Sequence, residues 1–302
     1  MVDVLIKAGC FVAIILIGYT LRKVGFFKEG DFQVLSKIVL KITLPAAIVS
    51  SVANKAIAPS LLFISLLGLM GGVLYIALMC LLNLRSTRDQ MAFDVVNTPG
   101  YNIGNFTLPF VQSFLGPVGV LTVSLFDVGN AMVCLGGSYS IASIIKSGGK
   151  FDVRKIVGKL IRSVPFDTYI IMLVLGLLQI PVPEFVTTFA GTISGGNAFL
   201  AMLMIGVGFN LSGDRSQIAH IAKIVAVRYG IAIVLALIFF NLLPLELEYR
   251  QALALLVFSP IGSAAPAFTA ELKGDIGLAS AINSVSIIIS VICIVAVLAL
   301  VL

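Results

Sequence analysis

The chain has 302 residues, of which 59% are hydrophobic and 11% charged, and it carries a formal net charge of +6. A soluble domain has roughly 25% charged residues, so this composition excludes a water-soluble protein and indicates a chain that lies mostly in lipid. The basic residues stand at the ends of apolar segments and do not alternate with aromatic residues, which argues against nucleic-acid binding.

Ten apolar segments of about 20 residues, the length that spans a bilayer, follow one another with short linkers. They are predicted at 4–21, 33–53, 60–82, 91–115, 117–145, 157–180, 186–210, 217–242, 250–272 and 276–301. The first segment is longer than the apolar core of a signal peptide, so we expect a retained helix. The sequence therefore predicts an all-α integral membrane protein with ten transmembrane helices.

Lysine and arginine gather in every second linker. The linkers after the odd-numbered segments hold Arg22, Lys23, Lys28, Arg85, Arg88, Lys146, Lys150, Arg154, Lys155, Lys159, Arg215, Lys223 and Lys273. The alternate linkers hold only Lys55 and Arg250. Because basic loops stay in the cytoplasm, this bias predicts that both termini are extracytoplasmic. We expect a multi-pass protein of the plasma membrane. The compact length suggests a bacterial origin, and in a bacterium this membrane is the inner membrane.

The longest polar stretch, IKSGGKFDVRKIVGK, divides the chain into two halves of five segments. We expect a first repeat at 1–145, a cytoplasmic linker at 146–156 and a second repeat at 157–302. An odd number of helices in each half forces the halves to insert in opposite orientations, as in inverted-repeat transporters. Pro99 and Pro260 stand at the same place in the fourth segment of each half.

Those two segments are interrupted by helix-breaking residues. The fourth reads NTPGYNIGNFTLPF, with Pro99, Gly100 and Pro109, and the ninth reads SPIGSAAPAF, with Pro260 and Pro266. Unwound backbone in a bilayer survives only inside protein or against a wet cavity. Two matched breaks predict a binding site near the midplane, and ordinary proline kinks are the alternative interpretation.

Half-helices that begin near Phe106 and Ala267 would direct free N–H groups at the crossing, which favours an anion. Neutral donors around them suit a carboxylate, and unwound carbonyls at the same place equally suit Na⁺. We therefore expect a small organic anion as substrate. The candidate substrate-binding residues are Asn102, Asn105, Thr107, Pro109, Asn130, Pro260, Ser263, Pro266 and Asn283.

Two acidic residues are candidates for binding a coupling ion, H⁺ or Na⁺. Asp127 lies inside the fifth segment, with Asn130 three residues later on the same helical face, and a structural role for this carboxyl group is the alternative. Glu271 follows the ninth break, where an interfacial position is the alternative. Asp94 is expected to be interfacial, and Lys41 is deep enough in the second segment to pair with a buried acid.

Catalytic and metal-binding patterns are missing from the sequence. His220 is the single histidine, the four cysteines are isolated, and neither HExxH, GxSxG nor a phosphate-binding loop is present. We expect no enzymatic activity, no metal site and no cofactor.

The stretch YNIGNFTLPFVQSFLG resembles the fourth-helix signature of the auxin efflux carrier family, the group of plant PIN carriers and bacterial malonate or malate permeases. Asn102 and Pro109 match that signature, and residues 114–116 are similar to its tail. The region around Pro260 is similar to the ninth helix of the family, and KITLPAAI, with Pro45, to its proline-kinked second helix. Thr107 and Ser263 stand where the family usually has glycine and asparagine.

The resemblance implies two inverted five-helix repeats whose fourth and ninth helices are broken and cross, like those of bile-acid transporters and NhaA-type antiporters. It places Asn102, Pro109 and Pro260 at the crossover. It also implies a mobile transport domain and a scaffold that forms a homodimer.

These observations predict a secondary transporter that moves a small organic carboxylate by alternating access at the crossover. H⁺, Na⁺ or the substrate gradient itself would supply the energy. We expect membrane lipid and a second copy of the chain as its partners. The alternatives are a channel and a membrane sensor that keeps the transporter fold.

Overall fold

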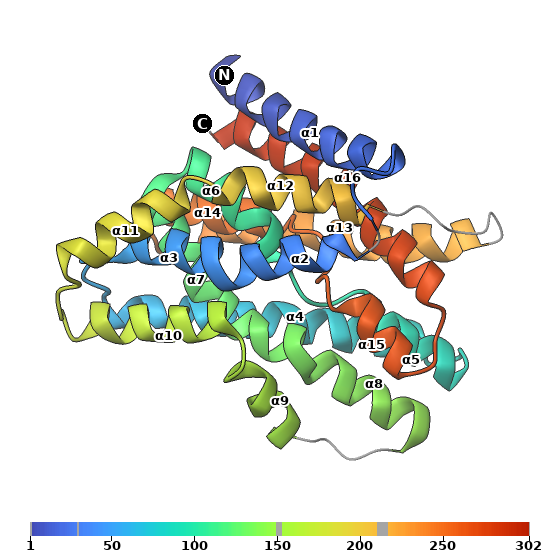
Figure 1. Cartoon of the computed structure of the whole chain (residues 1–302). Helices are drawn as coiled ribbons and strands as arrows, with labels where there is room; N and C mark the ends of the chain where they lie inside the picture. The colour runs from blue at the N-terminus through green and yellow to red at the C-terminus, as the bar shows by residue number, and fades with distance from the viewer. Residues whose placement is uncertain (1, 29, 149–152, 210–216, 302) are drawn as a thin grey trace.

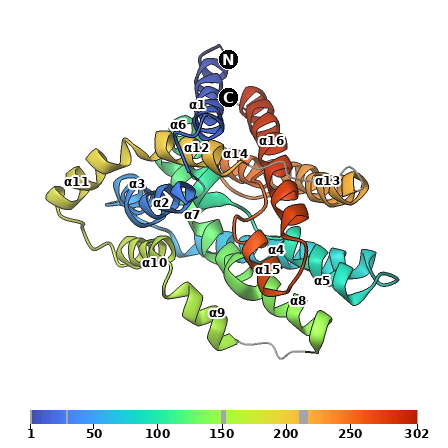
Figure 2. The ribbon, with the colours of Figure 1, turned by 45° about the vertical axis from the view of Figure 1, so that its right-hand side comes forward.

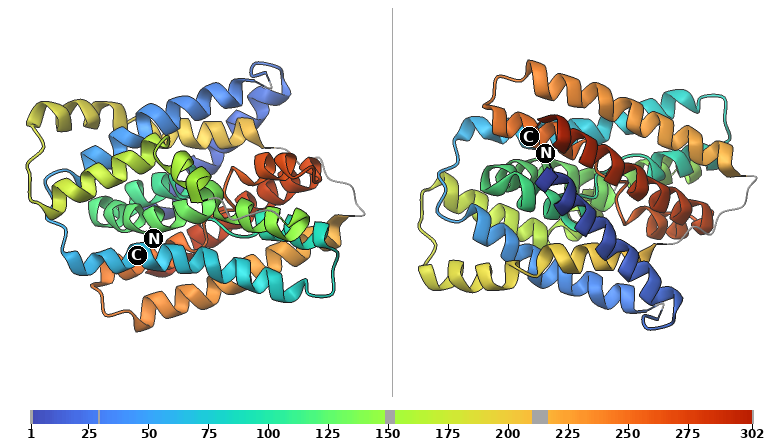
Figure 3. Two further views of the ribbon diagram at one scale, coloured as in Figure 1. Left: turned by 90° about the horizontal axis from the view of Figure 1, so that it is seen from below. Right: turned by 90° about the horizontal axis from the view of Figure 1, so that it is seen from above.

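The computed structural model describes residues 2–28, 30–148, 153–209 and 217–301, and all regular secondary structure in these ranges is helical. Lys150, Arg215 and part of the predicted linker, 149–152, lie outside them. Most helices run along one common direction (Figures 1 and 3). The N-terminal end of α1 and the C-terminal end of α16 lie close together, at the top of Figures 1 and 2.

Within the described ranges, six helical segments are long and apolar enough to cross a membrane. They are Asp31–Val52, Pro59–Leu82, Gly116–Ser147, Glu184–Gly208, Ile218–Leu242 and Ile276–Val301. Each overlaps one of the predicted segments. α1 (Val2–Lys23) precedes these segments, and α10 (Val164–Leu177) and two interrupted helices lie among them. An integral membrane protein with several spans accounts for this pattern.

Most spans contain more than one helical element. The elements within the spans are α2 (Asp31–Ile38), η1 (Val39–Thr43), α3 (Leu44–Val52), η2 (Pro59–Leu62), α4 (Phe63–Leu82), α7 (Gly116–Met132), η4 (Val133–Gly137), α8 (Ser138–Ser147), α11 (Glu184–Ser194), α12 (Asn197–Gly208), α13 (Ile218–Leu242) and α16 (Ile276–Val301). The first interrupted helix comprises α5 (Arg88–Asn97), η3 (Ile103–Thr107) and α6 (Leu108–Phe114), and the second comprises α14 (Leu247–Leu256) and α15 (Ala265–Glu271).

The predicted sixth segment, 157–180, begins at the wrong residue. A separate helix, α9 (Val153–Leu160), ends before α10 starts, and Figure 2 shows the turn between them. The hydroxyl of Ser163 accepts a hydrogen bond from the N–H of Phe166, and Pro165 occupies the first turn of α10. These two signals define a new helix N-terminus, which a hydropathy window does not detect.

Proline sets the local geometry of the helices that contain η1 and η3. In η1 and η3, five residues wind as a π-helix and are followed by Leu-Pro, at Pro45 and Pro109. Proline lacks an N–H, and its ring clashes with the carbonyl one turn earlier, so a wider turn accommodates it. Helical backbone resumes at Ile103 and at Ala265, slightly earlier than the predicted starts.

Glycines bring α4 and α7 into backbone contact. A Cβ atom at Gly129 would lie 1.8 Å from the carbonyl oxygen of Ser65, and one at Gly68 would lie 2.0 Å from that of Phe126. Membrane helices associate through such small residues, because lipid provides little hydrophobic drive between helices. α7 also packs against α6 of the first interrupted helix, so the contact holds α4 and this helix on the same α7.

Candidate functional site

The two interrupted helices are hydrogen-bonded to each other at their breaks. The backbone N–H of Asn102 donates to the carbonyl of Pro260 over 2.9 Å. Beside this bond, the hydroxyl oxygens of Thr107 and Ser259 lie 2.5 Å apart. Ser259 donates its own proton to the carbonyl of Leu256, so Thr107 is the donor in that pair. The predicted breaks therefore meet in space, and Thr107 joins them away from any open cavity.

Side chains of the helices that follow each break satisfy its unwound backbone. Asn130 of α7 accepts from the N–H of Tyr101 over 2.9 Å and donates to the carbonyl of Tyr101 over 2.8 Å. On α16 two residues share this task. Asn283 donates to the carbonyl of Ile261 over 3.0 Å, and the hydroxyl of Ser286 accepts from the N–H of Ile261 over 3.2 Å. Because a bilayer offers no water to unwound backbone, these bonds stabilise both breaks.

Arg228 of α13 is fully buried between the breaks, and the sequence analysis missed it. Its guanidinium donates to the carbonyls of Thr98 and Ser259 over 3.1 and 2.9 Å. The rings of Tyr75 and Tyr101 lie 4.6 and 4.4 Å from the guanidinium carbon, measured to their centroids. The only sequence signal was an arginine in the middle of an apolar segment, which marks a functional position in membrane proteins.

A cavity of about 230 Å³ lies against the two breaks. It brings together four of the nine predicted substrate-binding residues and one predicted coupling residue. These are Asn102, Asn105, Asn130, Ser263 and Asp127. Five others do not line it, namely Thr107, Pro109, Pro260, Pro266 and Asn283. The prolines and Thr107 shape the breaks, and Asn283 bonds to the backbone behind the cavity.

Several polar groups of the cavity wall already have partners. The amide nitrogen of Asn130 donates to Asp127 over 2.7 Å as well as to Tyr101, so both its protons are used. Asn105 donates to the hydroxyl of Ser263 over 3.3 Å. The buried Oδ1 atom of Asn105 has no partner among the described residues. A carboxamide with an unused acceptor could reorient towards a bound molecule, because its two ends differ only in donor and acceptor character.

Two cationic side chains also line the cavity. Lys41 lies in η1, and Arg162 lies in the turn between α9 and α10. No ion pair joins Lys41 to an acid of the described chain, and both side chains are exposed. Asp127 is the single carboxylate among the residues that line the cavity, so the cavity wall has two basic side chains and one acidic side chain. Arg162 was missed because it belongs to a turn that hydropathy merged into a helix.

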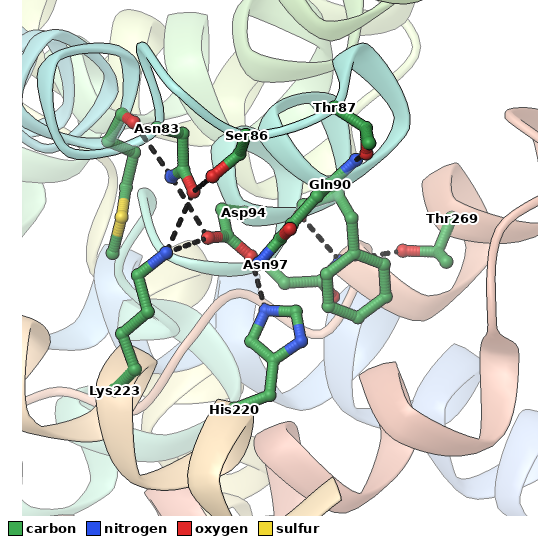
Figure 4. Close-up of polar contacts among 11 residues, drawn as sticks. Asn83, Ser86, Thr87, Gln90, Asp94, Asn97, His220, Lys223 and Thr269 are labelled. Carbon is green, nitrogen blue, oxygen red and sulfur yellow. Dashed lines mark hydrogen bonds and ion pairs between the residues drawn. The ribbon is translucent and has the colours of Figure 1, made fainter.

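A second buried polar cluster ties α5 to α13 (Figure 4). Asp94, which was expected near the membrane interface, is fully buried in protein, and the single histidine of the sequence, His220, contacts it. The Nε2 atom of His220 lies 2.5 Å from Oδ1 of Asp94, and the Nζ atom of Lys223 lies 2.8 Å from Oδ2. Asn83, at the end of α4, donates to the same Oδ2 atom over 2.9 Å. A buried carboxylate needs such partners, which come from distant parts of the chain.

The end of α5 is also bonded to the second interrupted helix. Asn97 donates to the hydroxyl of Thr269 in α15 over 2.9 Å. Figure 4 shows this bond beside the Asp94 cluster, so α5 contacts α4, α13 and α15 through polar side chains. These contacts make the interrupted helices and α13 one connected unit.

Cys134 touches both breaks from one side. A Cβ atom at Gly100 would lie 2.9 Å from its sulfur, and one at Gly262 would lie 2.5 Å away. Gly100 also has a φ of +82°, a left-handed conformation that side chains disfavour. The two glycines thus leave room for one thiol between the breaks.

Glu271, the second predicted coupling residue, lies away from Asp127. It lines a separate hollow of about 150 Å³ together with Tyr139 and Lys159. The Nζ atom of Lys159 lies 4.2 Å from the centre of the Phe268 ring beside this hollow. The structure therefore does not bring the two predicted coupling residues together.

Comparison with known proteins supports the resemblance seen in the motifs. The family model described as membrane transport protein, that of the auxin efflux carriers, matches residues 10–302. A comparison with curated proteins finds no significant match. The match covers nearly the whole chain, including both breaks, the cavity wall and the Asp94 cluster, and it confirms the prediction drawn from the motifs. The chain belongs to the membrane transport family of the auxin efflux carriers.

Proposed function

We propose that this membrane transport protein is a secondary transporter that carries a small organic anion by alternating access. The observation that carries the proposal is the cavity of about 230 Å³ at the contact of the two breaks. Broken helices that meet inside a membrane protein form the substrate sites of many carriers, because they expose backbone groups to a ligand. Ligand pockets for drug-sized molecules measure about 300–1,000 Å³, so this cavity suits a smaller substrate.

The charge of the cavity wall favours a carboxylate. Lys41 and Arg162 provide two positive charges against the single carboxylate of Asp127. Asn102, Asn105 and Ser263 add neutral polar groups on the side of the breaks. A carboxylate placed between these two sides would receive charge-assisted hydrogen bonds, which are stronger than neutral ones.

Asp127 is the proposed coupling residue. It lines the cavity, and its partner Asn130 holds the backbone of Tyr101 at the break. A proton on Asp127 would change the hydrogen bond to Asn130 next to the substrate site, which couples protonation to binding. Glu271 shares no cavity with Asp127, so we assign it no part in this coupling.

The proposal extends to the architecture and location of the protein. An asparagine of the following helix braces each break, Asn130 for the first and Asn283 for the second, which supports two related five-helix halves. The arrangement of basic loops supports extracytoplasmic termini and insertion in a plasma membrane. We propose a homodimer surrounded by lipid, in which a mobile transport domain of each protomer moves against its scaffold.

The test is uptake of labelled succinate and phenylacetate into proteoliposomes with imposed pH gradients. We expect saturable uptake that Asn102→Ala lowers, because this side chain lines the cavity. Asn241→Ala is the matched control, since Asn241 is exposed and bonds only to its own helix. Asp127→Asn should abolish accumulation driven by the pH gradient and spare exchange. Flux that does not saturate would indicate a channel, and absence of all uptake and binding would refute the carrier.

A further inference from the structure

Arg228 occupies the point where the two interrupted helices end. Its side chain has no exposed surface, although α13 is one of the apolar membrane-crossing helices. A charged side chain at such a depth is costly and is retained where it has a defined partner or function. No ion pair to an acid of the described chain accounts for it, because the acids in such pairs are Asp89 and Asp94.

The partners of Arg228 are carbonyls just past the C-terminal ends of two half-helices, Thr98 directly after α5 and Ser259 three residues after α14. α5 and α14 are ten residues long, and both point their C-terminal ends at the crossing. The C-terminus of a helix behaves as a charge of about −0.5, so two such ends together carry about −1. The single positive charge of the guanidinium balances this sum, and its planar fork reaches Thr98 and Ser259 at once.

The surroundings hold the guanidinium in this orientation. The rings of Tyr75 and Tyr101 lie over it at 4.6 and 4.4 Å, which stabilises a cation through the electron-rich ring faces. The hydroxyl of Tyr75 donates to the carbonyl of Arg228 itself over 2.9 Å. The ring of Tyr101 covers the guanidinium on one side and lines the cavity on the other, whereas Arg228 itself does not line the cavity. Arg228 is therefore a positioning residue behind the site.

In carriers with interrupted helices, the carbonyl ends of half-helices commonly coordinate Na⁺. In this chain those carbonyls already accept hydrogen bonds from Arg228. We propose that Arg228 is a built-in cation that takes the place of Na⁺ at the crossing, so that the anion site works without a co-bound metal cation. This inference rests on the proposed function, and it leaves a proton on Asp127 as the available coupling ion.

The experiment compares the full-length wild type with Arg228→Gln and Arg228→Lys in lipid nanodiscs and proteoliposomes. Thermal melting and uptake of labelled succinate and phenylacetate are measured with about 150 mM NaCl or choline chloride. Arg250→Gln is the matched control. Arg250 is also an arginine that donates to a backbone carbonyl, but only to one, that of Phe240, and it lies away from the crossing.

We expect wild-type melting and uptake to be the same in Na⁺ and in choline. Arg228→Gln frees both carbonyls, so Na⁺ should raise its melting temperature by about 2 °C or more, and its uptake should fall about 10-fold or more. Arg228→Lys keeps the charge but not the planar fork, so it should melt independently of Na⁺ and retain part of the uptake. Arg250→Gln should show no response to Na⁺.

Two results would overturn the inference. One is a wild type whose uptake or melting depends on Na⁺, and this result requires no variant to fold. The other is an Arg228→Gln protein that folds and transports like the wild type. If neither probe is transported by the wild type, the proposed function fails for these substrates. The Na⁺ response of melting in the wild type and the variants still decides the role of Arg228.

Discussion

Asn130 hydrogen-bonds both backbone groups of Tyr101, the N–H and the carbonyl, through one carboxamide. Tyr101 is the residue before Asn102, whose own N–H bonds to the second break. The position of the first break therefore depends on a side chain of α7. The same arrangement connects the geometry of the crossing to Asp127, the other partner of Asn130.

Replacing Asn130 with alanine should destabilise the protein strongly. The change leaves the N–H of Tyr101 without a partner and removes one donor each from the carbonyl of Tyr101, which still accepts from the N–H of Ile103, and from Asp127. Each buried unsatisfied group costs about 1–3 kcal/mol. Asn283→Ala should cost less, because it removes the donor to the carbonyl of Ile261 while Ser286 still satisfies the N–H of that residue. Thermal melting of both variants in the same detergent, followed by circular dichroism, measures the difference. Equal losses would show that the two asparagines do not brace the breaks as the structure indicates.

Replacing Asp94 with asparagine should destabilise the contact between α5 and α13. Breaking a buried ion pair by removing one partner costs about 3–5 kcal/mol, since the other charge is left unpaired. His220 and Lys223 are partly exposed, so we expect the lower end, about 3 kcal/mol. Asp89→Asn is the control, because its pair with Lys146 is exposed and contributes about 1 kcal/mol or less. Similar melting temperatures for the two variants would contradict this assignment.

Lys41→Gln should weaken anion binding and leave folding unchanged. The lysine lines the cavity and has no acid partner in the described chain, so its charge is available to a carboxylate. We expect the concentration for half-maximal uptake to rise about 10-fold, the usual size of one charge-assisted contact. Lys37→Gln, one turn earlier in α2, removes an equal charge outside the cavity and should have little effect. An equal rise in both variants would indicate a general surface-charge effect.

Gly129→Ala should separate α4 from α7. The added Cβ atom would lie 1.8 Å from the carbonyl oxygen of Ser65, and a backbone atom cannot move without its helix. Overpacking of this kind costs about 1–3 kcal/mol. Gly230→Ala is the control, because no atom lies within 4 Å of its added Cβ, and alanine favours helix there by about 1 kcal/mol. Melting temperatures should therefore move in opposite directions.

The sequence predicted the elements that depend on local chemistry. Apolar length placed the spans, and proline with glycine placed both breaks, because the steric effect of Pro109 or Pro260 acts within one helical turn. The start of α10 was predicted wrongly at 157. The apolar residues Val157 and Leu160 of α9 extended the hydropathy window across the turn that Ser163 caps.

The contacts between distant residues could not be read from the sequence. Asp94 and His220 were interpreted separately, because the pairing that buries one against the other depends on how α5 and α13 pack. Arg228 was missed for the same reason, since its partners are backbone carbonyls that any residue type could provide. Asn102, Asn105 and Ser263 were selected by their place near the breaks, and they lie together along the cavity.

The thiol of Cys134, held between Gly100 and Gly262, makes the crossing open to chemical control. Because the sulfur also lines the cavity, a group attached to it would lie in the cavity beside both breaks. Alkyl thiosulfonates of increasing length would fill the cavity step by step, and a reducing agent would empty it again.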